Sequence, residues 1–390
     1  MDIPASEILV AGGGIGGLAA AVALSRQGAD VQLIEQASAF SEVGAGIQIG
    51  PNVTRILRDW GLESGLRRVA SFPHELLARD ARSGRQLGRL PLGERAENLY
   101  GAPYACIHRA DLHQLLFQAV QAQGVPLLLN QRLVDVRLQG GQVTVHSEQG
   151  LQWQPALLVG ADGLWSRSRQ ALHLTEPARF SGHLAYRGLI PLPEPATEPQ
   201  VTVWMGPRLH VVHYPVQAGR ALNVVAIVHG EMPSDPQAWD HAAHAAHLFQ
   251  ALGPISRPLQ QTLEAVPAWR LWALNDRPPL TSAAQMGQGS IALLGDAAHP
   301  MRPYLAQGAG MAIEDAQVLA QCWAGPGSVG ERVQRYAQLR WPRNAQVQAR
   351  AIRNGRIFHA HGPVSWGRNV AMGVLGARVM DVPWLYQGLD

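Results

Sequence analysis

The sequence contains no lysine, so all 32 of its basic residues are arginine. Without lysine, no side chain can form a Schiff base, and no phosphate-binding loop that requires lysine is possible. The 29 acidic residues leave a net charge of only +3, which is scattered along the chain. Nucleic-acid binding needs a basic stripe, so no nucleic-acid partner is expected. A small anionic molecule is a more natural ligand for this chain.

Cysteine is scarce as well, since only Cys106 and Cys322 occur. Two cysteines make neither a disulfide framework nor a cysteine metal cluster, so no metal site is expected. No run approaches the ~20 apolar residues that a membrane helix needs. Met1 to Glu7 lack the basic stretch that would precede the apolar part of a secretory signal. We therefore expect a cytoplasmic protein without a membrane span, and the sequence indicates no oligomeric state.

The chain does contain enough apolar material for a large core. Its 390 residues are 47% apolar and 16% charged, which predicts one large or two interlocked globular domains. Ile8–Ala11 and Val31–Ile34 are apolar runs that predict buried strands. Between them, Leu18–Gln27 predicts a helix that stops at Gly28. The chain therefore opens with a βαβ unit.

A different pattern, typical of short strands, runs from about His183 to Ala268 and indicates a separate antiparallel sheet. Within it, Trp239–Leu252 is patterned as a helix. We predict an α/β fold in which this sheet is inserted into a discontinuous Rossmann-type domain. The expected boundaries are 1–182 for the first part of the Rossmann-type domain, 183–268 for the inserted substrate domain, and 269–390 for the second part with the C-terminal helices. A hairpin at about 76–92 is expected to contribute to the substrate domain.

The first chemical motif is the glycine-rich run from Gly12 to Gly17, which has the pattern G-x-G-x-x-G, follows a strand and opens a helix. Glycine permits the tight turn and the close approach of a pyrophosphate, and the helix N-terminus attracts the phosphates. Glu35 ends the second strand and can accept hydrogen bonds from an adenosine ribose. Together these features predict a dinucleotide site.

Two further motifs follow apolar runs. Gly160-Ala161-Asp162-Gly163 comes after the strand Leu157–Val159, and Gly295-Asp296 comes after Ile291–Leu294. A carboxylate at a strand end can accept hydrogen bonds from a sugar-like chain. Taken alone, each motif could equally be a simple turn or a helix cap.

The three motifs occur in the order and at the spacing of the flavoprotein aromatic hydroxylases that have one Rossmann-type domain, and the chain resembles that family over essentially its whole length. The resemblance implies bound FAD. The first motif would hold its ADP part, the second is associated with both FAD and NAD(P)H, and the third would bind the ribityl chain.

Other segments resemble the salicylate and hydroxybenzoate hydroxylase group. These are the loop Val43–Gln48, the stretch His108–Leu112 and the helix start Pro303–Met311. A helix that begins near Gly308 would stabilise negative charge on a reduced flavin. The adjacent pair Glu314 and Asp315 is expected to be solvated or to cap a helix. The cofactor-binding residues implied are Gly12, Gly14, Gly17, Glu35, Gln36, Val43, Gly46, Arg109, Val134, Asp162, Asp296, Gly308 and Ala309.

The resemblance also implies a reaction. NADH or NADPH, bound transiently, would reduce the FAD, and O2 would then form a flavin C4a-hydroperoxide whose distal oxygen attacks an aromatic hydroxy-acid. A base with a pKa near neutral would assist by removing the ring hydroxyl's proton. His210 and Tyr214 are the candidate catalytic residues, because their spacing resembles that of a His/Tyr pair in hydroxylases of hydroxybenzoate and hydroxynicotinate. Positions i and i+4 of a strand share one face, ~13 Å apart, so both would line one wall of a pocket. The alternative is that both are structural.

Five residues are candidates for contacting the substrate: Gln48, Tyr186, Arg187, Pro303 and Tyr304. Two of them depart from related patterns. Gln48 stands where hydroxynicotinate enzymes carry His, and Pro303 stands where 3-hydroxybenzoate enzymes carry Gln. A salicylate-like ring acid is therefore the expected substrate.

Two other functions stay open at this point. One is a quinone-biosynthesis hydroxylase, whose larger and more lipophilic substrate would need a wide apolar mouth. The other is a flavin-bound sensor or interaction protein without turnover, which substrate-stimulated NAD(P)H oxidation would exclude.

Overall fold

The computed structural model describes residues 6–40, 45–232 and 241–388. Contacts divide the chain into two compact units, and four of the boundaries between them fall inside two helices and two strands. Unit 1 comprises Met1–Glu42, Leu112–Arg179 and Asp276–Ala351. Unit 2 comprises Val43–Asp111, Phe180–Asn275 and Ile352–Asp390.

Unit 1 is built on a six-stranded sheet in the order β18-β19-β11-β1-β2-β7. Its strands pair in parallel, except that β18 is antiparallel to β19. Every residue of β1, β2, β11 and β19 is buried, which explains why these strands are almost purely apolar. The strands are β1 (Ile8–Ala11), β2 (Val31–Ile34), β7 (Leu127–Leu128), β11 (Leu157–Gly160), β18 (Gly287–Gln288) and β19 (Ile291–Leu293).

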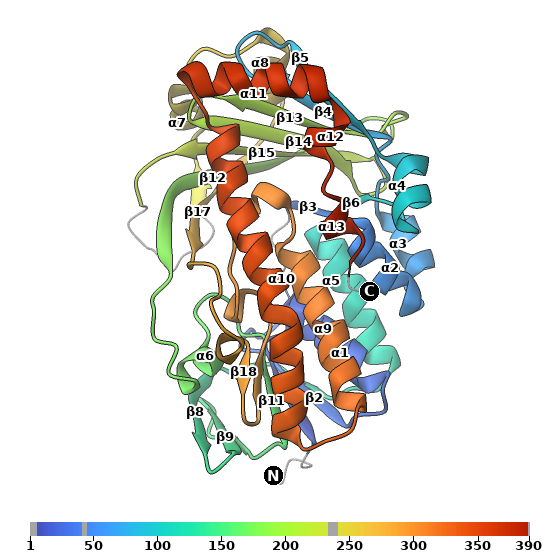
Figure 1. Cartoon of the computed structure of the whole chain (residues 1–390), viewed down its shortest axis with the longest axis vertical. Helices are drawn as coiled ribbons and strands as arrows, with labels where there is room; N and C mark the ends of the chain where they lie inside the picture. The colour runs from blue at the N-terminus through green and yellow to red at the C-terminus, as the bar shows by residue number, and fades with distance from the viewer. Residues whose placement is uncertain (1–5, 41–44, 233–240, 389–390) are drawn as a thin grey trace. The chain divides into compact units, whose positions relative to one another are not determined.

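Two helices of unit 1, α1 (Ile15–Ser25) and α9 (Gly308–Ala324), lie side by side (Figure 1). Their approach is close: a Cβ added to Gly16 would lie 3.3 Å from the Cβ of Ala312. A three-stranded sheet also belongs to unit 1 and contains β8 (Leu133–Gln139), β9 (Gln142–Ser147) and β10 (Gln152–Trp153). The other helices that begin or end in this unit are α5 (Arg109–Ala122), α6 (Arg167–Ala171) and α10 (Val329–Phe358), with η1 (Ala283–Gln285), η2 (Gly295–Ala297) and η3 (Pro303–Leu305).

Unit 2 is built on an eight-stranded sheet in the order β16-β17-β12-β15-β14-β13-β4-β5. Its pairings are antiparallel apart from β13 and β4, which run parallel. The strands are β4 (Glu75–Asp80), β5 (Gln86–Pro91), β12 (Arg179–Pro191), β13 (Gln200–Gly206), β14 (Leu209–Val216), β15 (Ala221–His229), β16 (His241–Ala243) and β17 (Trp269–Asp276).

Helices α7 (Ala245–Leu252) and α8 (Arg257–Glu264) cover one face of this sheet, where their leucines pack against Val211 and Val224. Elsewhere in unit 2, α11 (Gly362–Leu375) and α12 (Ala377–Met380) pack along β5 (Figure 1), and Met380 lies against Gly88. The remaining elements are β3 (Gly46–Ile49), β6 (Ala105–His108), α2 (Pro51–Asp59), α3 (Glu63–Val69), α4 (Gly93–Tyr100) and α13 (Pro383–Tyr386).

The predicted fold class is confirmed, including the opening βαβ unit and the hairpin, which is formed by β4 and β5. The first helix begins at Ile15 rather than Leu18, because part of the glycine-rich run is itself helical. The helix predicted from Trp239 is wrong at His241–Ala243, which forms a strand paired with β17. Residues 239 and 240 lie outside the described residues.

The two units also differ from the expected boundaries. Residues 43–111, β17 and the chain after residue 351 cluster largely with the inserted sheet. The cause is strand pairing between distant segments, since β4 pairs with β13. Among the described residues, no helix is long and apolar enough to cross a membrane.

Candidate functional site

The glycine-rich loop of unit 1 has the shape that a pyrophosphate needs. Gly12 has φ +109°, and a Cβ there would lie 2.4 Å from the carbonyl oxygen of Ala161. A Cβ on Gly17 would lie 1.8 Å from the Gly12 oxygen, so neither glycine tolerates a side chain. A Cβ on Gly14 would meet no atom within 4 Å, which leaves open space directly before α1. The backbone N–H groups and positive end of α1 therefore fit a phosphate of FAD.

Glu35 follows β2 and ties this loop together. Its carboxylate accepts hydrogen bonds from the backbone N–H of Gly13 at 2.6 Å and of Ala37 at 2.8 Å. Each carboxylate oxygen has a second lone pair, so ribose hydroxyls can bind as well. Gln36 follows with an exposed side chain. A ribose contact by either residue remains a prediction.

The three motifs meet at one edge of the unit 1 sheet, because β1, β11 and β19 are parallel neighbours. Ligands of open α/β sheets bind beyond the carboxyl ends of the strands. Asp296 lies in η2, three residues after the end of β19, and has an exposed side chain. Arg169 lies in α6, just after the second motif, and its Nη1 donates to the carbonyl oxygen of Ala298, just after the third motif, at 3.2 Å.

Asp162 makes the contacts expected of a residue that caps a helix. Its Oδ2 accepts hydrogen bonds from the backbone N–H groups of Arg167 and Ser168, and its Oδ1 accepts one from the Ser166 hydroxyl at 2.6 Å. Burial raises the pKa of Asp162, and these donors lower it in part. Its carboxylate therefore orders the start of α6, and a direct contact with the cofactor remains a prediction.

Helix α9 begins at Gly308, as expected, followed by Ala309. A Cβ on Gly308 would meet nothing within 4 Å, so space is available at this helix N-terminus. The preceding η3 contains two of the expected substrate residues, Pro303 and Tyr304. Burial raises the pKa of Tyr304, which keeps its phenol protonated. These features suit an anion near the start of α9.

The expectation of a solvated or capping pair at Glu314 and Asp315 is wrong. Both side chains are buried, and both form ion pairs with Arg340, which is itself fully buried. Asp315 Oδ2 also lies 2.5 Å from Nε2 of His299. Sequence spacing could not show this network, because its cation comes from α10.

For two other predicted cofactor residues, the structure gives little evidence of a role. Val134 lies on β8 with an exposed side chain, beside an irregularity in the pairing of β8 with β9. Val43 lies outside the described residues. Both assignments remain predictions.

In unit 2, the predicted flavin loop is anchored to the large sheet. The backbone N–H of Gly46 donates to Oδ1 of Asn223, a fully buried residue of β15. The backbone N–H of Arg109 donates to the carbonyl oxygen of Ala45 at 2.9 Å. Both anchors therefore hold β3 and the start of α5 in place within this unit.

A group of polar side chains lies beside this loop. The Tyr104 hydroxyl donates to Oε1 of Gln48 at 2.7 Å, and Gln48 also hydrogen-bonds Tyr214. Burial raises the pKa of both tyrosines, so their phenols stay protonated at neutral pH. Tyr214 is therefore a neutral phenol whose hydroxyl can donate a hydrogen bond, and its catalytic role remains a prediction.

Arg187 belongs to the same unit and stacks on Trp272, with its guanidinium carbon 3.7 Å from the ring centre. Its Nε is buried without a hydrogen-bond partner among the described residues. Burial lowers the pKa of Arg187 to about 10; Tyr214 partly opposes this, and the positive charge of Arg109 adds to it. The side chain therefore stays cationic at neutral pH, near a second arginine.

His210 is buried on β14, and its Nδ1 lies 2.8 Å from Nε2 of His359. Burial, and secondarily His183, lower the pKa of His210 to about 3. This is well below the near-neutral value expected of a base, because the imidazolium loses its hydration. The catalytic role of His210 remains a prediction.

Tyr186, in contrast, makes the contacts of a core residue. It is buried in the cluster under α7 and α8, with its ring 6.5 Å from that of Trp269. The substrate role assigned to Tyr186 remains a prediction, and the structure offers a packing role that explains the residue.

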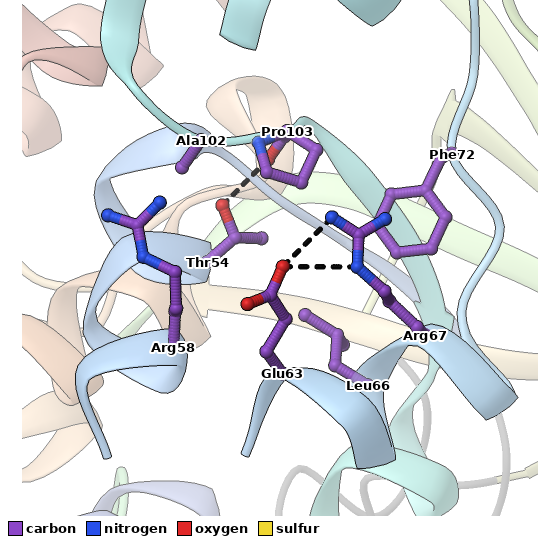
Figure 2. Close-up of a pocket in the computed structure, with 8 residues that line it drawn as sticks. All are labelled: Thr54, Arg58, Glu63, Leu66, Arg67, Phe72, Ala102 and Pro103. Carbon is purple, nitrogen blue, oxygen red and sulfur yellow. Dashed lines mark hydrogen bonds and ion pairs between the residues drawn. The ribbon is translucent and has the colours of Figure 1, made fainter. Parts of the chain in front are cut away.

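Unit 2 also contains a hollow between α2 and α3, lined by residues that include Thr54, Phe72 and Pro103 (Figure 2). The ion pair of Glu63 and Arg67 lies in it, at 2.8 Å. None of the predicted site residues lines this hollow, and its exposed ion pair suits a solvated surface. We therefore do not assign it to the flavin or the ring substrate.

Sequence reasoning missed several residues that position the site, namely Tyr104, Asn223, Arg340 and His359. Each acts through a partner more than 20 residues away in the chain. A buried polar residue inside an apolar strand, as Asn223 is, was the one signal available. It indicates that a hydrogen-bond partner is required but not which one.

Comparison with known proteins agrees with this geometry. The family model described as FAD binding domain matches residues 5–358. A 3-hydroxybenzoate 6-hydroxylase of Polaromonas naphthalenivorans is 36% identical over 99% of this chain and 96% of its own. A 6-hydroxynicotinate 3-monooxygenase of Bordetella bronchiseptica is 38% identical over 82% and 83% of the two chains.

The fold is shared with solved structures as well. A salicylate hydroxylase substrate complex matches with a TM-score of 0.82 at 24% identity, covering 99% of this chain and 96% of that one. The family match and the relatives above 30% identity settle the classification. The chain belongs to the FAD-binding family of single-component aromatic hydroxylases and is an FAD-dependent monooxygenase.

Proposed function

We propose that this enzyme uses NADH or NADPH and O2 to hydroxylate an aromatic ring that carries both a carboxylate and a hydroxyl group. Bound FAD supplies the redox chemistry, by accepting electrons from the nicotinamide and activating O2. The observation that carries the proposal is the environment of Arg187. The names of the two relatives, a hydroxybenzoate and a hydroxynicotinate enzyme, support the same class of substrate.

Within the described part of the chain, Arg187 forms no ion pair with a carboxylate. Its Nε has no partner among the described residues, and the charge of Arg109 is near enough to affect its pKa. A partly buried cation is costly until an anion pairs with it, and guanidinium binds a carboxylate through two parallel hydrogen bonds. A ring acid would supply that carboxylate.

The ring hydroxyl would then be oriented by Tyr214, which is held by Gln48. We propose that His210 takes up the hydroxyl proton at its Nε2. For that, Nδ1 must carry a hydrogen and donate it to His359, which the 2.8 Å separation permits. The pKa of about 3 describes the protein without a ligand. A nearby anionic substrate favours the imidazolium and would raise this pKa.

The test measures NADH and NADPH oxidation together with hydroxylated product, using the FAD-loaded full-length protein. The panel contains salicylate, 3-hydroxybenzoate, 4-hydroxybenzoate and 6-hydroxynicotinate, each beside its neutral carboxamide. We expect one acid to accelerate oxidation with matching product. Its carboxamide should be much poorer, since a charged hydrogen bond contributes about 1.5–3 kcal/mol, or roughly 10–100-fold.

Arg187→Gln should remove this preference for the acid. It should raise KM for the acid and leave KM for the carboxamide little changed. Arg89→Gln, an exposed arginine whose partner is Glu75, is the matched control and should behave as wild type. Acid and carboxamide turned over equally well by the wild type would contradict the proposal. Stimulation only by long-chain quinone precursors would favour the quinone-biosynthesis hydroxylase.

A further inference from the structure

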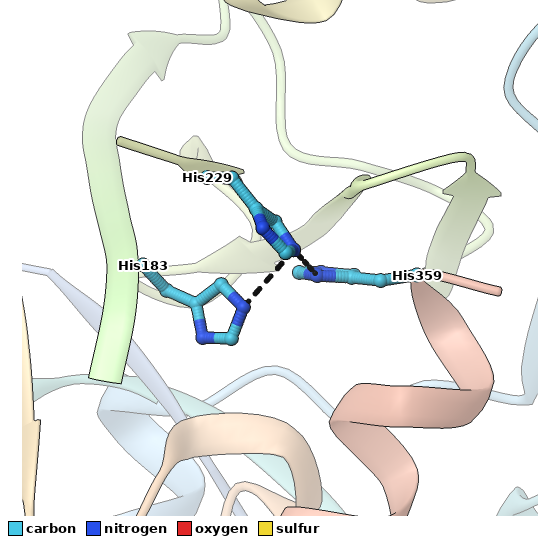
Figure 3. Close-up of side chains that lie close together, drawn as sticks. All are labelled: His183, His229 and His359. Carbon is cyan, nitrogen blue, oxygen red and sulfur yellow. Dashed lines mark hydrogen bonds between the residues drawn. The ribbon is translucent and has the colours of Figure 1, made fainter. Parts of the chain in front are cut away.

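Three histidines of unit 2 bring ring nitrogens together (Figure 3). His183 begins the part of β12 that pairs with β15, His229 ends β15, and His359 follows α10. One nitrogen from each ring lies within 4.8 Å of the other two. Two of the three separations are 3.1 Å, and both involve Nε2 of His229.

The backbone fixes this arrangement. His183 and His229 are directly opposite each other in the antiparallel pair of β12 and β15, so their side chains share one face. The carbonyl oxygen of His359 accepts a hydrogen bond from the backbone N–H of Arg208 at 3.1 Å. Elements far apart in the sequence therefore supply the three rings.

Hydrogen bonding alone does not explain the position of the His229 ring. Its Nε2 lies 3.1 Å from Nε2 of His183 and 3.1 Å from Nδ1 of His359. A neutral imidazole nitrogen is either a donor with one hydrogen or an acceptor with one lone pair. One such atom cannot serve two ring nitrogens well. A cation between the three nitrogens satisfies all three lone pairs.

We propose that His183, His229 and His359 bind one divalent transition-metal ion of the zinc class. With Zn–N bonds of ~2.0–2.1 Å, tetrahedral geometry places ligand atoms roughly 3.3–3.4 Å apart, close to the 3.1 Å separations seen here. Three imidazoles leave the fourth position to water. His229 is partly exposed, which gives the ion a path from solvent.

The surroundings agree with three neutral ligands. Nε2 of His359 lies 2.8 Å from Nδ1 of His210, so a metal on Nδ1 of His359 leaves its Nε2–H to donate to His210. Proton uptake at Nε2 of His210 needs the reverse direction, so we expect it only in the metal-free protein. Metal-bound histidines commonly donate their second N–H in this way, which fixes the ring. Burial, and secondarily the positive charge of Arg208, lower the pKa of His229. The side chain of Arg208 is exposed, so solvent screens its charge.

The test uses chelator-treated, FAD-loaded full-length protein titrated with ZnCl2 in a calorimeter, and with Co²⁺ followed by visible absorption. We expect one Zn²⁺ per chain and a tetrahedral Co²⁺ spectrum. His183→Gln and His229→Gln should each weaken binding by more than the ~10–100-fold that loss of an outer-shell partner costs. His244→Gln, an exposed histidine at the start of α7, is the control and should bind as wild type.

The wild-type titration decides by itself if a variant fails to fold, which FAD content and circular dichroism would reveal. No saturable Zn²⁺ binding, or an octahedral Co²⁺ spectrum, overturns the proposal. Equally tight binding in folded His183→Gln and His229→Gln also overturns it. The proposal does not depend on which ring acid is the substrate.

Discussion

The backbone N–H of Gly46 donates a hydrogen bond to the side-chain oxygen of Asn223 across 2.6 Å. The two residues are 177 positions apart, and the bond holds β3 against the large sheet of unit 2. Space at this contact is tight. A Cβ on Gly46 would lie 2.7 Å from Cγ of Asn223 and 2.7 Å from Cε2 of Tyr214.

Gly46→Ala should therefore destabilise the protein, because Asn223 and Tyr214 are both buried and have little room to move. Overpacking of this kind costs about 1–3 kcal/mol, measurable by urea denaturation. Gly373→Ala is the control, since its Cβ meets nothing within 4 Å on the exposed side of α11. There, alanine should be neutral or stabilise the helix by about 0.5–1 kcal/mol. Equal effects of the two substitutions would contradict the tight contact.

Glu35→Ala should weaken FAD binding, because it removes the acceptor for Gly13 and the expected acceptor for the ribose. Loss of charged hydrogen bonds of about 1.5–3 kcal/mol predicts a roughly 10–100-fold higher Kd. Fluorescence titration of the apoprotein with FAD measures this Kd. Asp59→Asn removes an exposed carboxylate of α2 and should leave the Kd unchanged. A Glu35→Ala protein that binds FAD as wild type would exclude the ribose contact.

Arg340→Met should strongly destabilise the protein. The substitution leaves Asp315 as a buried carboxylate without its arginine, whereas Glu314 keeps its ion pair with Arg343. Breaking a buried pair costs about 3–5 kcal/mol. Arg67→Gln breaks the exposed pair with Glu63 and should cost well under 1 kcal/mol. The losses in free energy of unfolding relative to the wild type, measured in urea, should therefore differ several-fold between the two variants. Similar losses would show that the buried network contributes little.

Stability should fall as the pH drops from about 6.5 to about 4, in part because of His213. Burial, and secondarily the charge of Arg79, lower the pKa of His213 from 6.5 to about 4 in the folded protein. In this window the unfolded chain binds a proton that the folded protein does not, so acid favours unfolding. At 1.36 kcal/mol per pKa unit, the loss is on the order of 3 kcal/mol at most.

His213→Asn removes this titration. The free energy of unfolding, measured in urea at intervals from pH 7 to pH 4, should then vary less steeply than in the wild type. Identical slopes for both proteins would show that His213 titrates normally in the folded state.

The nucleotide-binding half of the site could be predicted because its requirements are local. Gly12 and Gly17 are needed by a turn and a helix start that lie within six consecutive residues. Strands made wholly of apolar residues, such as β1 and β11, predict a buried parallel sheet by composition alone. Asp162 shows the limit of this reasoning, since the same carboxylate suits a cofactor contact and a helix cap, and its contacts are those of the cap.

What the sequence determined by itself is the family, the flavin and the order of the strands at the start of the chain, because these depend on motifs of contiguous residues. Only the tertiary structure decided which distant side chains meet. Arg340 meets Asp315, Asn223 meets Gly46, and His359 meets His229 through contacts that join residues 25 to 177 positions apart. Such contacts have no periodicity in the sequence, since they are set by packing between elements rather than by the geometry of one element.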